Sequence, residues 1–220
     1  VYAKGTTLGG DDGIAVAMAL AAMDDKTLRH PRIEAIFTVD EEVGMEGAAG
    51  LDVSPITARR MINIDSEDEG IFTVSCAGGA RANLRLPLET APCSLPTLVL
   101  ELTGLTGGHS GFDIQLPRRN ALTTLGEFLT ACPGGIAELR GGTSFNAIPT
   151  EATAVLSTAN PEAVTGAVEQ WRQELAAFRA SDPGLTVTLE EHSPVDAVWD
   201  HDTRRQVLNF LARLPSGVQS

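Results

Sequence analysis

Basic side chains are scarce in this sequence of 220 residues. It contains 16 Lys and Arg against 29 Asp and Glu, which gives a formal net charge of -13 at pH 7. Nucleic-acid binding needs clustered Lys and Arg to displace the counterions of the phosphate backbone. We therefore expect no nucleic-acid partner. The acidic balance suits both a cytoplasmic protein and a site that gathers carboxylates around cations.

Cysteines and long apolar runs are also few. Cys76, Cys93 and Cys132 stand at irregular spacing without a Cys-x-x-Cys pair, so we expect reduced packing residues and no thiolate metal site or redox motif. The first residues contain no apolar core of a signal peptide. No run approaches the roughly 20 apolar residues needed to span a bilayer. We expect no membrane partner.

Several catalytic motifs are missing as well. The glycine pairs at residues 107–108 and 141–142 lack the Gly-Lys-Ser/Thr ending of a phosphate-binding loop, and the dinucleotide fingerprint is absent. Phe112 occupies the second glycine position of a Gly-x-Ser-x-Gly elbow, which excludes Ser110 as a hydrolase nucleophile. The acidic run at residues 65–69 lacks the alternation and the glycine of an EF-hand loop.

The residues that are present are typical of a folded globular protein, with 43% hydrophobic and 20% charged side chains. Residues 11–25 predict a helix capped by Asp11 or Asp12, with Ile14 and Met18 among the residues spaced for burial. Strand-forming residues follow at 33–39 and 61–64. This alternation predicts a parallel α/β sheet, in which reactive groups lie beyond the carboxyl ends of the strands.

After about residue 78 the pattern changes. It predicts strands at 81–88 and 97–102, a helix at 117–131, strands at 136–140 and 150–158, a helix at 161–179, and a strand at 185–190. The β-α-β-β-α-β order within this stretch is typical of an α+β ferredoxin-like layer with two helices on one face. We place a domain boundary between residues 1–78 and residues 79–220.

Four carboxylates follow turns or strand ends in the first part: Asp11, Glu41, Glu42 and Asp65. Hydrolysis by two metal ions needs a bridging carboxylate and terminal ligands, which such a set can supply. The spacing also fits simpler roles. Asp11 could be only a helix cap, Glu41 and Glu42 only solvated charges, and Asp65 only part of the acidic run. The spacing by itself leaves both interpretations open.

Four ordered motifs resemble the di-zinc metallopeptidase family of aminoacylases, carnosinases and glutamate carboxypeptidases. They are Gly-Thr-Thr-Leu-Gly-Gly-Asp-Asp-Gly at 5–13, Asp-Glu-Glu-Val-Gly at 40–44, Asn-Ile-Asp-Ser-Glu at 63–67 and Gly-Gly-His-Ser-Gly at 107–111. The last motif and Arg-Gly-Gly-Thr-Ser-Phe-Asn-Ala-Ile-Pro at 140–149 are most similar to the branch of bacterial aminoacyl-histidine dipeptidases. The resemblance spans most of the chain. It implies a partial zinc-peptidase α/β domain at 1–78 and a ferredoxin-like lid domain at 79–220.

The resemblance also implies roles for the carboxylates. Asp11 bridges two zinc ions, Glu42 binds one ion and Asp65 binds the other, with manganese or cobalt as possible substitutes. Glu41 binds no metal and acts as the general base, taking the proton of a water whose pKa the zinc lowers toward about 7. The implied partner is a short peptide substrate.

In the lid domain the resemblance implies that His109 donates a hydrogen bond to the tetrahedral oxyanion. Asn146 and Arg140 become candidate binders of the substrate backbone or carboxylate, because Arg can grip a carboxylate with two hydrogen bonds. Turn roles remain equally open for both residues. The lid is also a candidate surface for homodimer formation.

Two family features are missing. Members carry a His-x-Asp motif before the bridging aspartate and a zinc-binding His near the C-terminus, and neither occurs in this chain. Without these nitrogen ligands each zinc site is incomplete. We expect the chain to be an inactive piece of a cytoplasmic Xaa-His-type dipeptidase, incomplete at both ends. The alternatives are an aminoacylase or carboxypeptidase of the same family, and a non-catalytic relic or dimerisation module.

Overall fold

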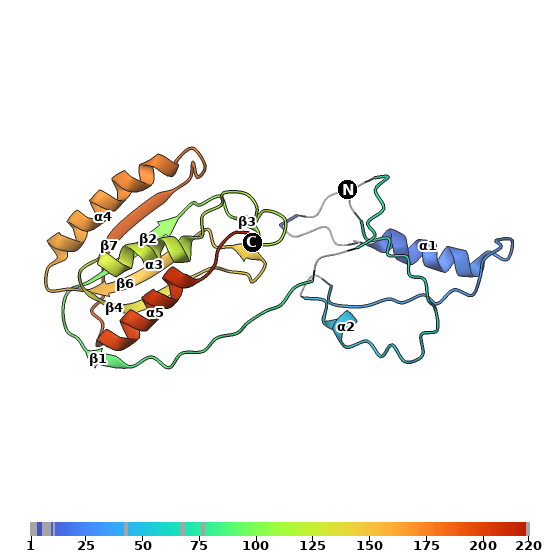
Figure 1. Ribbon diagram of the computed structural model, residues 1–220, viewed down its shortest axis with the longest axis horizontal. Coiled ribbons are helices and arrows are strands. Elements are labelled where there is room, and N and C mark those ends of the chain that lie inside the picture. The colour runs from blue at the N-terminus through green and yellow to red at the C-terminus, as the bar shows by residue number, and fades with distance from the viewer. Residues whose placement is uncertain are drawn as a thin grey trace. The chain divides into compact units, whose positions relative to one another are not determined.

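Figure 1 shows the computed structural model of the chain, which describes residues 4–5, 10, 12–41, 44–66, 69–75 and 78–218. The chain divides into an N-terminal unit, Val1–Arg81, and a C-terminal unit, Ala82–Ser220. The N-terminal unit contains helices α1 (Gly13–Asp24) and α2 (Glu46–Ala49), and the C-terminal unit contains all eight strands that the described residues form. The roles of residues 1–78 as a partial catalytic domain and of residues 79–220 as a lid stay predictions.

Helix α1 confirms the helix expected over residues 11–25. Its N-cap is Asp12, whose Oδ1 accepts a hydrogen bond of 3.0 Å from the Ala15 N–H, as is common for Asp at this position. No residue of α1 is buried, however, and Ile14 and Met18 are 66% and 54% exposed. The burial expected for these two side chains is therefore wrong, because burial requires a second layer that covers them.

The strands expected at residues 33–39 and 61–64 are not formed in the described part of the chain. A parallel strand needs hydrogen-bonded neighbours, and parallel sheets are normally covered on both faces. Ile36, Phe37 and Val39 are instead 45%, 50% and 66% exposed, and no described residue before Thr97 is buried. The described residues of the N-terminal unit thus do not form the parallel sheet that the strand-forming residues predicted.

Glu34 nevertheless fixes local structure in this unit. Its carboxylate accepts hydrogen bonds from the Thr57 hydroxyl and N–H and from the Ala58 N–H, at 2.6, 2.9 and 2.9 Å. Arg32 pairs with the same carboxylate at 3.0 Å. The Thr57 hydroxyl and the Ala58 N–H are the main groups that lower the pKa of Glu34 to about 2. These contacts tie two segments of the unit that are far apart in the sequence.

The C-terminal unit has the β-α-β-β-α-β order expected from the sequence. Its elements are β2 (Thr97–Thr103), α3 (Ala121–Ala131), β4 (Gly135–Gly141), β6 (Ala152–Ser157), α4 (Pro161–Leu175) and β7 (Thr186–His192). The four strands form one sheet in the order β4-β6-β2-β7, and each neighbouring pair is antiparallel. The ferredoxin-like topology expected for this unit is therefore confirmed.

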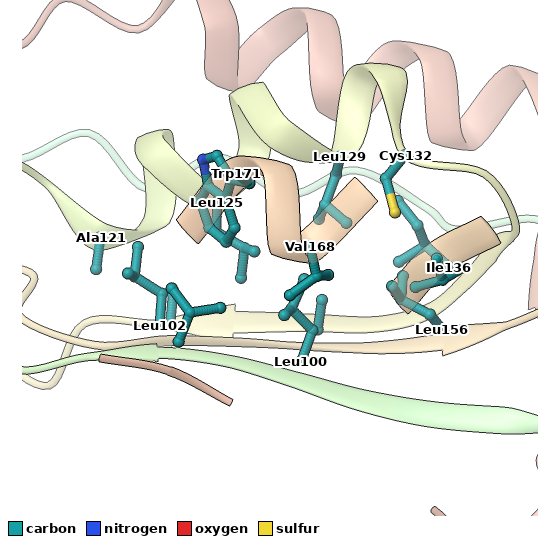
Figure 2. Close-up of a cluster of buried hydrophobic side chains, with 14 of the residues drawn as sticks. Leu100, Leu102, Ala121, Leu125, Leu129, Cys132, Ile136, Leu156, Val168 and Trp171 are labelled. Atoms are coloured by element: carbon teal, nitrogen blue, oxygen red, sulfur yellow. The ribbon is translucent and has the colours of Figure 1, made fainter. Parts of the chain in front are cut away.

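The core of the C-terminal unit lies between this sheet and its helices, as Figure 2 shows. Alternate residues of β2, Leu98, Leu100 and Leu102, are buried, which is the period of a strand with one covered face. Helix α3 adds Leu125 and Leu129, both 0% exposed. Helix α4 contributes residues at helical spacing: Val164, Val168, Trp171 and Leu175. The Trp171 ring stacks on Phe128 of α3 with centroids 4.3 Å apart.

Helix α5 (His201–Arg213) was not predicted from the sequence. Its N-cap is Asp200, whose Oδ1 accepts the Thr203 N–H at 2.7 Å, and this hydrogen bond is the main cause that lowers the pKa of Asp200. The helix packs against α3, where Gly126 lets the Leu211 side chain approach closely. The capping residue and the spacing of Leu208 and Leu211 are signals that could have identified it. None of the described helices is long and apolar enough to cross a membrane.

The strand expected at residues 81–88 is not formed. Pairing begins only at β1 (Thr90–Pro92), which forms a two-stranded sheet with β8 (Ala197–Trp199). Leu84, Leu86 and Leu88 are 69%, 46% and 50% exposed. Alternating apolar residues are therefore not sufficient for a strand where no neighbouring segment completes the hydrogen bonds.

The two described cysteines, Cys93 and Cys132, are free. Cys132 is buried in the core, and this burial raises the pKa of its thiol to about 11. Cys93 is half-buried, and its Sγ lies 3.1 Å from the Ser157 hydroxyl oxygen. This hydrogen bond is the largest cause that lowers the pKa of the Cys93 thiol. Cys76 lies outside the described residues.

The position of Leu100 predicts a large loss of stability on truncation. Leu100→Ala should lower the free energy of unfolding by about 2–5 kcal/mol, because it removes a side chain that is fully buried in the core. Urea denaturation followed by circular dichroism measures the change. Leu86→Ala is the matched control, since Leu86 is 46% exposed and should change stability by no more than about 0.5 kcal/mol. Equal effects of the two substitutions would contradict this description of the core.

Candidate functional site

The four carboxylates predicted to serve a two-metal site belong to the N-terminal unit. Asp11 and Glu42 lie outside the described residues. Glu41 and Asp65 are described, and both are exposed. The Glu41 carbonyl accepts two backbone N–H groups, each at 3.1 Å, in the turn that follows it. The roles predicted for all four carboxylates stay predictions.

Carboxylate oxygens are suitable ligands for zinc and for harder divalent ions, so the predicted donor set fits a metal in chemical type. Of these donors the structure describes only Asp65, whose exposed side chain is accessible to an ion. Within the described ranges, no group of three or more His, Cys, Asp or Glu side chains is arranged to hold a metal ion. The two-zinc site therefore stays a prediction.

His109 lies on a two-stranded ribbon of the C-terminal unit. Strand β3 (Gly108–His109) pairs antiparallel with β5 (Ala147–Ile148), so that His109 stands opposite Ala147. The next residue, Ser110, donates its N–H to the Asn146 carbonyl at 2.7 Å. The structure thus brings together His109 and Asn146, although α3 and β4 separate them along the chain.

The imidazole of His109 is held through its Nδ1 atom. The N–H groups of Gly111 and Phe112 donate to Nδ1 at 3.0 and 3.2 Å. A backbone N–H can only donate, so Nδ1 carries no hydrogen, and in the neutral ring the hydrogen is on Nε2. The residue is exposed. His109 is therefore oriented to donate one hydrogen bond from Nε2.

Asp113 closes the turn that holds this ring. Its Oδ2 accepts the His109 N–H at 2.7 Å, and its own N–H donates to the His109 carbonyl at 2.9 Å. Gly108 has a φ of +145°, and a Cβ there would lie 2.7 Å from Asp113 Oδ2. A Cβ on Gly111 would lie 3.1 Å from His109 Nδ1. The geometry of the turn therefore requires glycine at position 108, while position 111 leaves little room for a larger residue.

Arg140 lies apart from this ribbon, on strand β4 opposite Thr153 of β6. Its guanidinium pairs with Glu138 at 3.2 Å, and the two side chains are 66% and 51% exposed. Only one guanidinium nitrogen, Nη1, makes this contact, and an exposed ion pair of this kind is weak. Asn146 is also engaged, since its Oδ1 accepts the Ser144 hydroxyl. The substrate-binding roles of both residues stay predictions.

Two residues that contact His109 were not identified from the sequence. Asp113 accepts the His109 N–H, and the Phe112 ring lies against the imidazole with centroids 5.0 Å apart and planes tilted by 47°. An acidic residue shortly after a glycine-rich segment commonly accepts a backbone N–H of its own turn, so Asp113 had a sequence signal. Phe112 had no such sequence signal, because the contact of its ring with the imidazole depends on the conformation of the turn.

Sequence and structure comparisons relate the chain to bacterial dipeptidases. No protein-family model matches the chain. Cytosol non-specific dipeptidase of Escherichia coli (strain K12) is 42% identical over 227 residues, which cover 99% of this chain and 47% of that protein. Peptidase T of Escherichia coli O1:K1 / APEC is 38% identical over 84 residues, 37% of this chain and 20% of that protein.

A solved structure matches the whole chain. The crystal structure of aminoacylhistidine dipeptidase from Vibrio alginolyticus has a TM-score of 0.69 and 30% identity, covering 100% of this chain and 46% of that chain. The chain therefore spans about half the length of these two dipeptidases. The resemblance predicted from the motifs is confirmed, and the match supports a peptidase-like α/β fold, although the parallel sheet itself is not among the described elements.

The turn around His109 predicts a measurable effect of Asp113→Ala. Removing the acceptor of the His109 N–H should speed hydrogen exchange of that amide by about two- to tenfold. This factor corresponds to the net free energy that one such hydrogen bond contributes to stability. NMR-detected exchange measures the rate, and the ¹⁵N spectrum of the ring should place the hydrogen on Nε2 in the unmodified chain. Asp113→Asn, which keeps an acceptor oxygen, is the control. Unchanged exchange, or a hydrogen on Nδ1, would contradict the geometry.

Proposed function

We propose that this chain is part of a dipeptidase of the di-zinc metallopeptidase family, which hydrolyses dipeptides of the Xaa-His type. The observation that carries the proposal is the 42% identity to a dipeptidase of Escherichia coli across 99% of the chain. The match to aminoacylhistidine dipeptidase from Vibrio alginolyticus supports the substrate class. The name of the first relative supports a cytosolic location.

The carboxylates of the N-terminal unit hold the metal ions in this proposal. Asp11 would be the ligand shared by two zinc ions, Glu42 would hold one ion and Asp65 the other, and manganese or cobalt could take the place of zinc. A bound zinc ion lowers the pKa of a water ligand toward about 7. Glu41 accepts a proton from the attacking water and delivers it to the leaving amine, a role that an exposed carboxylate can fill.

His109 stabilises the charge that develops on the carbonyl oxygen of the scissile peptide. Its Nε2 is the donor, because the Gly111 and Phe112 N–H groups occupy Nδ1 and keep it free of hydrogen. A donor whose orientation is already fixed costs little reorganisation when the charge forms. Asn146, whose carbonyl accepts the Ser110 N–H, binds the substrate backbone, and Arg140 binds the substrate carboxylate.

The chain alone is inactive in this proposal. The carboxylate set lacks the imidazole ligands that complete zinc sites of this kind. In addition, α1 has no buried residue, and the side chains of Ile14, Met18 and Leu20 are more than half exposed. Apolar surface of this extent is normally covered by other polypeptide. The remainder of a longer protein covers it and supplies the missing ligands. The C-terminal unit serves as the lid and as a dimerisation surface.

Activity measurements on two polypeptides test the proposal. The chain by itself, given zinc or manganese, should hydrolyse Ala-His far more slowly than the longer protein that contains it. In the longer protein, Glu41→Gln should lower kcat by about 10²–10⁴-fold, the usual contribution of a general base, with metal content unchanged. Glu46→Gln, a neighbouring exposed Glu outside the proposed site, is the matched control.

Three results would contradict the proposal. Turnover by the chain alone at the rate of the longer protein would rule out the incomplete site. A longer protein that cleaves N-acyl amino acids in preference to Xaa-His dipeptides would assign it to the aminoacylases. A longer protein without bound metal that loses nothing on Glu41→Gln would be a non-catalytic relic.

A further inference from the structure

Two phenylalanines of the C-terminal unit, Phe112 and Phe145, are unusually exposed. Phe112 is 81% exposed and Phe145 is 65% exposed. The next most exposed large apolar side chain between Thr90 and Arg213 is Phe210, at 42%. The core of the same unit buries its large apolar side chains almost completely. The exposure of these two large aromatic side chains therefore needs an explanation.

Both rings belong to the same end of the β3–β5 ribbon. Strand β3 ends at His109 and β5 begins at Ala147, and these residues are paired in the antiparallel register. The chain leaves β3 through the turn that contains Phe112 and enters β5 from the turn that contains Phe145. The hydrogen bond from the Ser110 N–H to the Asn146 carbonyl joins the two turns.

The position of Phe112 is fixed by the backbone that holds the imidazole. Its N–H donates to His109 Nδ1 at 3.2 Å, and its ring lies against the imidazole with centroids 5.0 Å apart. Phe145 directly precedes Asn146 in the chain. Phe112 therefore contacts His109, and Phe145 is the chain neighbour of Asn146. The proposed function gives His109 and Asn146 roles in binding the substrate.

We propose that Phe112 and Phe145 form the apolar surface that receives a large side chain of the dipeptide substrate, and so determine specificity. The inference rests on the proposed function, since it takes the neighbourhood of His109 as the place where the peptide binds. In this inference the two rings favour dipeptides that carry a bulky apolar or aromatic side chain, including the imidazole of a histidine.

The chemistry of a dipeptide supports this assignment. Its termini and its single peptide bond are common to all dipeptides, so only contacts to side chains can distinguish one from another. Aromatic rings bury a large area against an aliphatic chain or a planar ring and lose little conformational freedom. A very small side chain gains little from such a surface. The rings therefore favour bulky over small substrates without contributing to the bond cleavage.

The test compares Ala-Leu and Ala-His with Ala-Gly in the longer protein. The Phe112→Ala/Phe145→Ala double variant should lower the ratio of kcat/KM for Ala-Leu over Ala-Gly by about tenfold or more, the usual worth of a lost apolar contact. The ratio for Ala-His should fall in the same direction. Phe145→Leu keeps an apolar side chain and should retain most of the preference.

Phe210→Ala is the matched control, because it removes a partly exposed phenylalanine of α5 and should leave both ratios unchanged. Thermal melting shows that the variants remain folded. An unchanged ratio in an active double variant would overturn this inference alone. A uniform loss for all three dipeptides would also overturn it, by showing that the rings only position His109. If the unmodified longer protein cleaves no dipeptide, the proposed function fails and the inference fails with it.

Discussion

Backbone hydrogen bonding on both edges of strand β2 is the constraint on which the C-terminal unit depends. The strand pairs with β6 on one side and with β7 on the other, antiparallel in both cases. Because neither edge is left open, its buried N–H and C=O groups are satisfied. The leucines on its covered face can then pack under α3 and α4 at no cost in unpaired polar groups. Both helices therefore have a fixed surface to cover.

The ribbon that carries His109 is anchored to the end of this strand. Just beyond β2, the Leu105 N–H donates to the Thr150 carbonyl at 3.2 Å, and the Thr106 N–H donates to Asp182 at 2.9 Å. Asp182 is almost fully buried, with 1% exposure, so this contact is shielded from water. The imidazole is thus oriented by the backbone N–H groups of Gly111 and Phe112, in a turn that the Asp113 carboxylate closes.

The N-terminal unit shows what happens when such pairing is missing among the described residues. The unit contains many strand-forming residues and an apolar helix, yet none of its described residues is buried. Polar contacts such as those of Glu34 with Thr57 and Ala58 hold segments together without forming a core. Apolar composition provides the material for a core, but a second layer is needed before that surface leaves water.

The sequence by itself determined the features that depend on neighbouring residues. It located the helix capped by Asp12, the element order of the C-terminal unit and the motifs that relate the chain to dipeptidases, because periodicity, caps and motifs are local patterns. It failed for the strands at 33–39, 61–64 and 81–88, since a strand exists only with a partner. Helix α5 had usable local signals and was still missed.

The tertiary structure alone decided how the residues near His109 are arranged. It brought Asn146 next to Ser110, although α3 and β4 separate them along the chain. The contacts of His109 Nδ1 with Gly111 and Phe112, and of Arg140 with Glu138, join residues two or three positions apart. The contact between Ser110 and Asn146 depends on where the chain folds back, and no residue type or spacing specifies that in advance. A hydrogen bond between distant segments forms only when the packed core holds both of them in place, so its partners are decided by the fold.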